Sequence, residues 1–284
     1  MAAQGAEGRS QRVEIELPLS RWSLGRGLEA ATDRVALETT VEIAACGVLL
    51  ARLQCLPADL EDLGVGFALS EGFAPPGASV RAALAPGGGR VELEIPGADA
   101  SALEARAARG ALASGCGRGL FISEIRARAA AAGERGFAPE EILEAVAELE
   151  RSGRLFRSTG CVHAAAVRRD GRLLGFREDI GRHNAIDKAA GAVARSGGSL
   201  EGTLLVTTGR LSADVAAKAV RLGAWGLASR GAPTARAVEI AAEMGLVLAG
   251  FARGGRLNIY CGAQRLAGLS ERNERGEPPR PGTP

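Results

Sequence analysis

The chain has 284 residues, of which 46% are hydrophobic and 24% charged, so it is large enough for one large or two small folded domains. A net charge of +2 and an aromatic content of 4% argue against nucleic acid or an anionic membrane as a partner. No apolar run approaches the roughly 18 residues of a membrane span, and residues 1–11 lack the apolar stretch of a signal peptide. Because the five cysteines are scattered and form no C-x-x-C pair, the sequence predicts a cytoplasmic protein.

The first part of the chain is rich in predicted strands. Residues 1–10 and 270–284 are rich in Gly, Pro, Glu and Arg and are predicted to be disordered tails. Apolar runs bounded by turn residues predict strands over 13–17, 41–44 and 48–53, and a hairpin of 79–85 with 90–95. Helices are predicted from Pro57 to Gly72, over 98–112 and over 139–151.

The second part of the chain alternates strands with helices. A hairpin of 162–168 with 173–178 is expected to turn at Asp170-Gly171. Further strands are predicted over 203–208, near Leu227, and over 246–252 and 257–261, and helices over 184–194, 213–224 and 233–244. This order predicts a mixed α/β fold in which helices pack on a partly parallel sheet.

Cys116 has the context least like that of a core residue. An isolated cysteine is most often a small buried hydrophobe. Cys116, however, lies in the glycine-rich segment 114–120, whose backbone is open and offers no apolar neighbours, and Arg118 would favour the nucleophilic thiolate. The other cysteines lie in or beside apolar strands and are predicted to be core residues: Cys46, Cys55, Cys161 and Cys261. We therefore expect Cys116 to be the reactive thiol.

His163 begins a predicted strand and is a candidate metal ligand, base or core histidine. A zinc deaminase needs H-x-E followed by P-C-x-x-C. Here His163 is followed by Ala164-Ala165, and no P-C-x-x-C occurs in the sequence. With two histidines and no clustered cysteines, the chain has too few ligands for a catalytic zinc site, so we expect no bound metal.

Two polar segments lie where a predicted strand ends and a helix begins. In the first, Arg182 and His183 lie at a helix N-terminus, where amide donors and the helix dipole attract anions. In the second, Arg210 precedes Ser212, which is a good N-cap residue. Two such sites in one domain predict a phosphorylated ligand.

A third segment, 250–260, places two arginines around a glycine turn. Arg253 and Arg256 flank Gly254-Gly255 between two strands. One interpretation is a hairpin with exposed arginines. The other is a turn whose open backbone grips a phosphate or a purine, with Phe251 as a stacking platform.

Taken together and in this order, the segments resemble the FdhD family, the formate dehydrogenase accessory sulfurtransferases. The resemblance runs from about residue 34 to 268. It is carried by residues 56–67 with Ser70-Glu71-Gly72, by Ser158-Thr159-Gly160 with 162–166, and by 178–188, Gly209-Arg210-Leu211-Ser212, Ala232-Pro233-Thr234, and Gly250-Phe251 with Arg253. The segment 178–188, EDIGRHNAIDK, is close to diagnostic of the family.

The resemblance implies a sulfurtransferase that carries sulfur as a persulfide. Cys116 falls on the first cysteine of a family loop of the form S-C-G-x-C-G and would accept sulfur from a cysteine desulfurase. The sulfur would pass to the molybdenum (or tungsten) bis-guanine-dinucleotide cofactor before that cofactor enters the formate dehydrogenase apoprotein. The implied cofactor-binding residues are Phe251, Ala252, Arg253, Gly254, Gly255 and Arg256, together with Arg182, His183, Arg210 and Ser212. A homodimer is also implied.

The resemblance also implies a fold. Residues 158–269 would form a three-layer domain like that of cytidine deaminase but without the zinc, joined by a cysteine loop and connecting helix at 113–157 to a smaller strand-rich domain at 11–112. The chain departs from the family pattern at Thr40 and Cys161, and at Gly119, which replaces the second loop cysteine. One thiolate is enough for attack on a persulfide, so Cys116 is predicted to act alone.

Two other functions compete with sulfur transfer. The first is a cofactor-binding chaperone that inserts the cofactor into formate dehydrogenase and in which Cys116 is inert. The second is a nucleotide-processing enzyme on a deaminase-like scaffold, which would require zinc.

Overall fold

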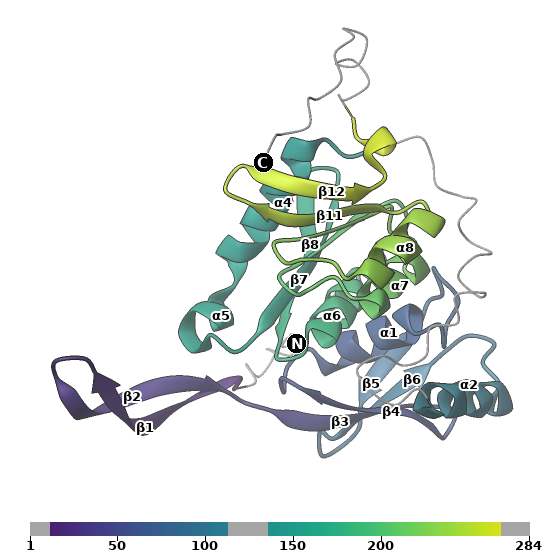
Figure 1. The fold of residues 1–284 in the computed structure, drawn as a ribbon. Coiled ribbons are helices and arrows are strands. Elements are labelled where there is room, and N and C mark those ends of the chain that lie inside the picture. Colours follow the sequence, from purple (N-terminus) through teal and green to yellow (C-terminus); the bar gives the residue numbers. More distant parts are fainter. Residues whose placement is uncertain (1–11, 113–135, 268–284) are drawn as a thin grey trace, which may run out of the picture.

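The computed structural model describes residues 12–112 and 136–267, and it confirms the predicted mixed α/β class (Figure 1). Its strands are β1 (Glu14–Ser23), β2 (Gly27–Ala36), β3 (Thr39–Ala45), β4 (Val48–Cys55), β5 (Arg81–Leu84), β6 (Arg90–Glu94), β7 (His163–Arg169), β8 (Arg172–Asp179), β9 (Leu204–Thr207), β10 (Gly226–Ser229), β11 (Val247–Arg253) and β12 (Arg256–Cys261). The helices are α1 (Leu60–Ser70), α2 (Ala100–Leu112), α4 (Pro139–Ser152), α5 (Arg154–Thr159), α6 (Arg182–Arg195), α7 (Ala213–Arg221), α8 (Ala235–Glu243) and the short η2 (Ala263–Arg265). Within these residues, no helix is long and apolar enough to span a bilayer.

A six-stranded sheet forms the centre of the molecule, in the order β12-β11-β10-β9-β7-β8. Strands β9, β10 and β11 are parallel, whereas β7, β8 and β12 are antiparallel to their neighbours. The side chains of β9 alternate, as expected for a strand buried on both faces. Leu204 and Val206 pack in the core beneath α4, and Leu205 packs in the core beneath α6, α7 and α8.

The second face of this sheet is covered by α6, α7 and α8, and α1 packs between α6 and the four-stranded sheet β4-β3-β6-β5. One continuous core joins Ile43 of β3 and Leu63 of α1 to Ile186 of α6 and Val215 of α7. Helices α1 and α6 approach closely at two glycines, Gly66 on α1 and Gly191 on α6. A Cβ atom at Gly66 would lie 1.7 Å from the carbonyl oxygen of Asp187.

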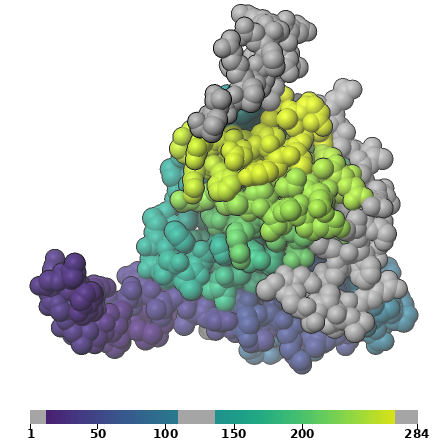
Figure 2. All heavy atoms as spheres, in the orientation of Figure 1, coloured from purple at the N-terminus to yellow at the C-terminus, as the bar shows by residue number. Residues whose placement is uncertain are grey.

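Strands β1 and β2 form a two-stranded ribbon that extends away from the rest of the molecule (Figures 1 and 2). The sequence predicted only a short strand at 13–17, because β2 is rich in Ala, Glu and Asp, which are poor strand formers. The pairing of Glu14 with Ala36 through Ser23 with Gly27 extends both strands to ten residues.

Other boundaries differ from the predictions by a few residues, for local reasons. Helix α7 ends at Arg221 rather than at 224, because Gly223 has a φ of +79° and its amide bonds the carbonyl of Val220. Helix α8 begins after Thr234, whose hydroxyl accepts the amide of Ala237. Helix α5 was not predicted. Its first three amides donate to the carboxylate of Glu178, a partner that is distant in sequence.

Candidate functional site

The predicted ligand-binding segments come together at one edge of the six-stranded sheet. Because β9, β10 and β11 are parallel, their carboxyl ends share this edge with the start of β7 and the end of β8. Open α/β sheets bind ligands at the carboxyl ends of their parallel strands. His163 begins β7, Arg182 and Arg210 follow β8 and β9, and Phe251 lies in β11 just beyond its parallel pairing with β10. We call this edge the carboxyl-edge site.

Short hydroxyl side chains fix the backbone of the carboxyl-edge site. The hydroxyl of Thr208 accepts the amide of Ala164 at 3.0 Å and lies 3.4 Å from Nδ1 of His163. The hydroxyl of Ser229 donates to the carbonyl of Gly209 at 2.6 Å. These bonds hold the start of β7 and the ends of β9 and β10 in fixed positions relative to one another.

Glycines let these strand ends touch. The amide of Phe251 donates to the carbonyl of Gly231, and a Cβ atom at Gly231 would lie 3.0 Å from the carbonyl of Gly209. A Cβ atom at Gly209 would lie 2.9 Å from Cβ of Arg182. A continuous line of close approaches thus runs from Phe251 on β11 through Gly231 and Gly209 to Arg182 on α6.

The N-termini of α6 and α7 lack side-chain caps, which differs from what the sequence predicted for Ser212. Ser212 occupies the N-cap position of α7, but its side chain makes no capping hydrogen bond. Buried side-chain atoms without a hydrogen-bond partner include Nε of Arg182, Nε2 of His183 and Oγ of Ser212. Buried polar atoms normally have partners, so these three atoms mark the N-termini of α6 and α7 as the candidate part of the site.

His183 contributes a hydrogen-bonding group to the site rather than the positive charge that we predicted. Burial, followed by the nearby charges of Lys218 and Arg182, lowers the pKa of His183 from 6.5 to about 4. Burial, together with Arg182 and Arg210, also lowers the pKa of His163. At neutral pH the positive charge of the site therefore comes from its arginines.

The titration of His183 should be visible as a pH dependence of stability. Because its pKa is lower in the folded chain, the unfolded chain binds a proton below pH 6.5 that the folded chain does not. The free energy of unfolding should therefore fall between pH 6.5 and pH 4, with about 2–3 kcal/mol of this fall due to His183.

Urea unfolding of the wild type and of His183→Gln at pH 7 and pH 4 measures this contribution. Other titrating groups cancel in the comparison, and the variant should lose about 2 kcal/mol less than the wild type on acidification. An equal loss in both proteins would contradict the lowered pKa.

The predicted ligand-binding residues of the β11–β12 hairpin differ in whether their side chains are accessible to a ligand. Phe251 has a left-handed φ of +52° at the carboxyl edge, and the guanidinium of Arg253 lies 5.7 Å from the centre of its ring. Ala252 is 3% exposed and packs in the core beneath α4, so its side chain is unavailable to a ligand. Gly254-Gly255 forms the turn, both residues with positive φ, and Arg256 is exposed after it.

The predicted reactive residue Cys116 and the nearby Gly119 lie outside the described residues. Of the other cysteines, Cys55 is buried, and burial raises its pKa to about 12. Cys46 and Cys161 are exposed rather than in the core as predicted. Cys46 lies in the turn between β3 and β4, and Cys161 lies in the connection between α5 and β7, so the apolar neighbours that suggested burial belong to the adjacent strands.

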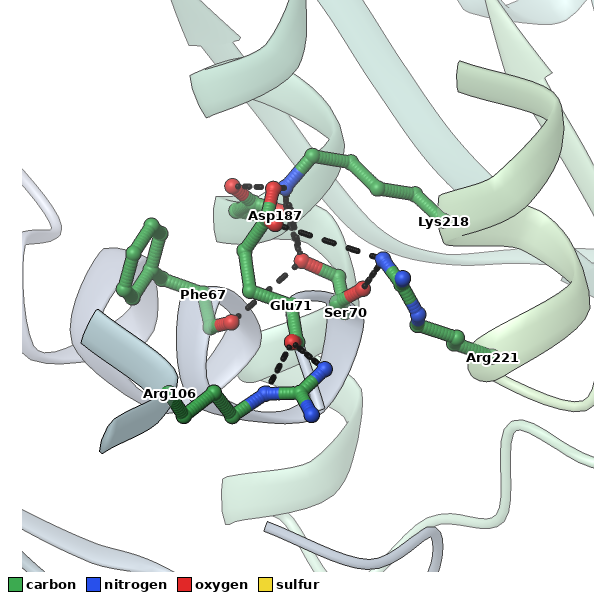
Figure 3. Close-up of polar contacts among 7 residues, drawn as sticks. All are labelled: Phe67, Ser70, Glu71, Arg106, Asp187, Lys218 and Arg221. Atoms are coloured by element: carbon green, nitrogen blue, oxygen red, sulfur yellow. Dashed lines mark hydrogen bonds and ion pairs between the residues drawn. The ribbon is translucent and has the colours of Figure 1, made fainter. Parts of the chain in front are cut away.

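One buried cluster beneath the site was not predicted at all. Lys218 on α7 contacts Ser70 and Glu71 at the end of α1 and Asp187 on α6 (Figure 3). Arg221 donates to the carbonyl oxygen of Ser70 at 3.3 Å. In the sequence, Ser70-Glu71 and Asp187-Lys188 belong to the family motifs, and no local pattern links them to Lys218.

The family pattern of FdhD/NarQ matches residues 36–267, which include the whole carboxyl-edge site. The chain belongs to the FdhD/NarQ family. A relative from Cupriavidus necator named sulfur carrier protein FdhD is 37% identical over 257 residues, which are 87% of this chain and 88% of the relative. A protein of the same name from Chromobacterium violaceum is 39% identical over 231 residues, which are 78% of this chain and 86% of the relative.

A solved structure of the family type shares this fold. The crystal structure of a candidate formate dehydrogenase accessory protein from Desulfotalea psychrophila aligns with a TM-score of 0.72 and 25% identity. The alignment covers 90% of this chain and all of that structure. Membership of the FdhD/NarQ family thus rests on both sequence and fold.

Proposed function

We propose that this chain is a sulfur carrier in the maturation of formate dehydrogenase, and that it binds a guanine-dinucleotide cofactor at the carboxyl-edge site. The observation that carries the binding proposal is the set of buried, unpartnered atoms on Arg182, His183 and Ser212. They lie at two uncapped helix N-termini that suit phosphate groups. The name of the relatives, sulfur carrier protein FdhD, supports the sulfur-carrying role.

Cys116 is the proposed carrier of the sulfur. Its thiolate attacks the terminal sulfur of a persulfide on a cysteine desulfurase, the S–S bond of the donor breaks, and the donor cysteine leaves as a thiolate. Cys116 then bears the sulfur as Cys116–S–SH, and the exchange needs no external oxidant or reductant.

Delivery of the sulfur takes place on the bound cofactor. After the persulfide loses its proton to water, its outer sulfur becomes sulfide on the metal by accepting two electrons. Reduced molybdenum or tungsten supplies these electrons as it is oxidised, and Cys116 returns as a thiolate. Arg182 and Arg210 hold the cofactor phosphates during this step, and Phe251 offers a ring face to a guanine.

Mass spectrometry of loaded peptides tests the carrier role. After incubation with a cysteine desulfurase and cysteine, we expect one added sulfur on the peptide that contains Cys116 and none in the Cys116→Ala variant. Cys46→Ala, which removes an exposed cysteine in the turn between β3 and β4, away from the carboxyl-edge site, should load like the wild type. Sulfur on a different cysteine, or on none, would refute the assignment.

The insertion chaperone without sulfur transfer remains the competing function. It requires the same carboxyl-edge site, but it predicts that a strain dependent on Cys116→Ala still makes active formate dehydrogenase. Complementation with Cys116→Ala and Arg256→Ala separates the two. Loss of activity with both variants supports the sulfur carrier, and loss with Arg256→Ala alone supports the chaperone.

A further inference from the structure

A buried ion cluster lies directly beneath the first turns of α6 and α7. The ammonium of Lys218 is 2.8 Å from Oγ of Ser70, 2.8 Å from each carboxylate oxygen of Asp187 and 2.8 Å from Oε1 of Glu71 (Figure 3). The side chain of Lys218 is 4% exposed. Three helices, α1, α6 and α7, therefore meet around one positive charge that solvent does not reach.

Both lysines of the chain are buried in ion pairs. The chain has two lysines among its 35 Lys and Arg residues, and both are in the described part and buried in ion pairs. The ammonium of Lys218 donates to acceptors on two other helices, Ser70 and Glu71 at the end of α1 and Asp187 on α6, because its three hydrogens point in three directions, whereas the donors of arginine lie in one plane. The geometry of the cluster thus depends on lysine at position 218.

Helical spacing connects the cluster to the carboxyl-edge site. His183 precedes Asp187 by four residues on α6, and Asp214 precedes Lys218 by four residues on α7, so each pair shares one face of its helix. The ion pair of Asp187 with Lys218 consequently fixes the first turns of the two helices against each other. His183 lies in that first turn of α6, where its Nε2 is buried without a partner.

The surroundings of His183 determine what it can bind. The charged and titratable groups that act on its imidazole are Lys218 from α7, Arg182 from α6, Glu71 from α1 and His163 from β7. Cations predominate among them, so a second positive charge on the imidazole is disfavoured. An uncharged imidazole offers one N–H donor and one nitrogen acceptor, which match a hydroxyl or the edge of a base better than a phosphate.

We propose that His183 recognises an uncharged polar group of the nucleoside part of the ligand, and that Lys218 is the positioning residue that holds His183 for this role. The inference rests on the proposed nucleotide site, in which Arg182 and Arg210 take the phosphates. Lys218 is too deeply buried to touch the ligand and acts only through the packing of α6 against α7. His183 thereby makes the site prefer a nucleotide over a phosphate group without a nucleoside.

Calorimetric titration with two probes tests the contact. GDP carries both the nucleoside and the phosphates, and inorganic pyrophosphate carries only the phosphates. We expect His183→Ala to weaken GDP binding about tenfold, the effect of one hydrogen bond, and to change pyrophosphate binding less than about twofold. Equal weakening of both probes would overturn the proposal, as would a wild type that binds pyrophosphate but gains nothing from the nucleoside.

Histidine NMR tests the positioning role. Because the chain has only two histidines, ¹⁵N-histidine labelling gives two imidazole signals, and the His183→Ala variant assigns them. In the wild type the His183 signal should be that of a neutral imidazole at pH 7 and should shift on addition of GDP. A protonated His183 at pH 7, or a signal insensitive to GDP, would overturn the proposal even if no other variant folds.

Variants at the two buried lysines separate positioning from general stability. Lys218→Met, or Lys218→Met combined with Asp187→Leu, should move the titration of His183 up toward neutral pH and make GDP binding depend on pH between 6 and 8. Lys188→Met removes the other buried lysine, which pairs with Asp179 at 2.7 Å, and should leave the titration of His183 unchanged. The same shift in Lys188→Met would show that the effect is only structural.

The result of these binding titrations is independent of the sulfur-loading experiment on Cys116. Loading of Cys116 by a desulfurase does not require the nucleotide, so the persulfide result stands whichever way these titrations fall. If the wild type loads sulfur but binds neither GDP nor pyrophosphate, this inference is overturned while the carrier role survives.

Discussion

Replacing Gly66 with alanine should lower the free energy of unfolding by more than about 3 kcal/mol, although alanine is the better helix former by about 1 kcal/mol. The new Cβ atom would lie 1.7 Å from the carbonyl oxygen of Asp187, a backbone atom that cannot rotate away. Helices α1 and α6 would have to separate. This would also displace the first turn of α6 and with it the carboxyl-edge site.

Gly64→Ala is the matched control for this prediction. It lies on the same helix, but its Cβ atom would meet a side-chain methyl of Val91 at 2.8 Å, which can move. We expect it to cost no more than about 2 kcal/mol by urea unfolding.

Gly191 gives a second test, because its Cβ atom would lie 1.9 Å from the carbonyl of Asp62 across the same interface. Once Gly66→Ala has separated the helices, Gly191→Ala should cost less than it does alone. Strict additivity of the two changes would show that the close approach is not the cause.

The general fold was predictable because its elements carry local signals. The hairpin of β7 and β8 turns at Asp170-Gly171, and both residues have the positive φ that this sequence favours. Strands that alternate with helices predicted a partly parallel sheet, and the structure shows that its parallel strands are β9, β10 and β11, with Arg182, Arg210 and Phe251 at one edge. The ribbon of β1 and β2 was missed in part because only strand pairing, and not composition, extends β2.

What could not be predicted depends on contacts between distant residues. Ser70 and Lys218 are 148 residues apart, and Asp187 and Lys218 are 31 apart, so no window of sequence shows that they meet. The pKa of His183 depends first on its burial and then on charges that include Lys218 and Glu71, which lie on or beside other helices. A histidine beside an arginine at a helix start suggests an anion site, and only its burial among cations from other elements indicates that the imidazole is uncharged.

Removing the charge of Lys218 alone should lower the free energy of unfolding by about 3–5 kcal/mol, because it leaves the carboxylate of Asp187 buried without its cation. Burial opposes the charge of Lys218, yet the carboxylates of Asp187 and Glu71 outweigh it and raise the pKa of Lys218. The ammonium therefore stays charged at neutral pH. Removing it leaves the carboxylates of Asp187 and Glu71 without their cation, which lowers the free energy of unfolding.

The double variant Lys218→Met with Asp187→Leu distinguishes the cost of an unpaired charge from the value of the pair. Apolar side chains of similar volume often replace a buried ion pair with little loss, so we expect the double variant to be more stable than Lys218→Met alone. Arg236→Ala is the exposed control. Its ion pair with Glu239 is on the surface of α8 and should contribute less than about 0.5 kcal/mol. If the double variant is instead the least stable of the three, the cluster contributes to stability as an ion pair, and Lys218 and Asp187 hold α6 and α7 together through that attraction.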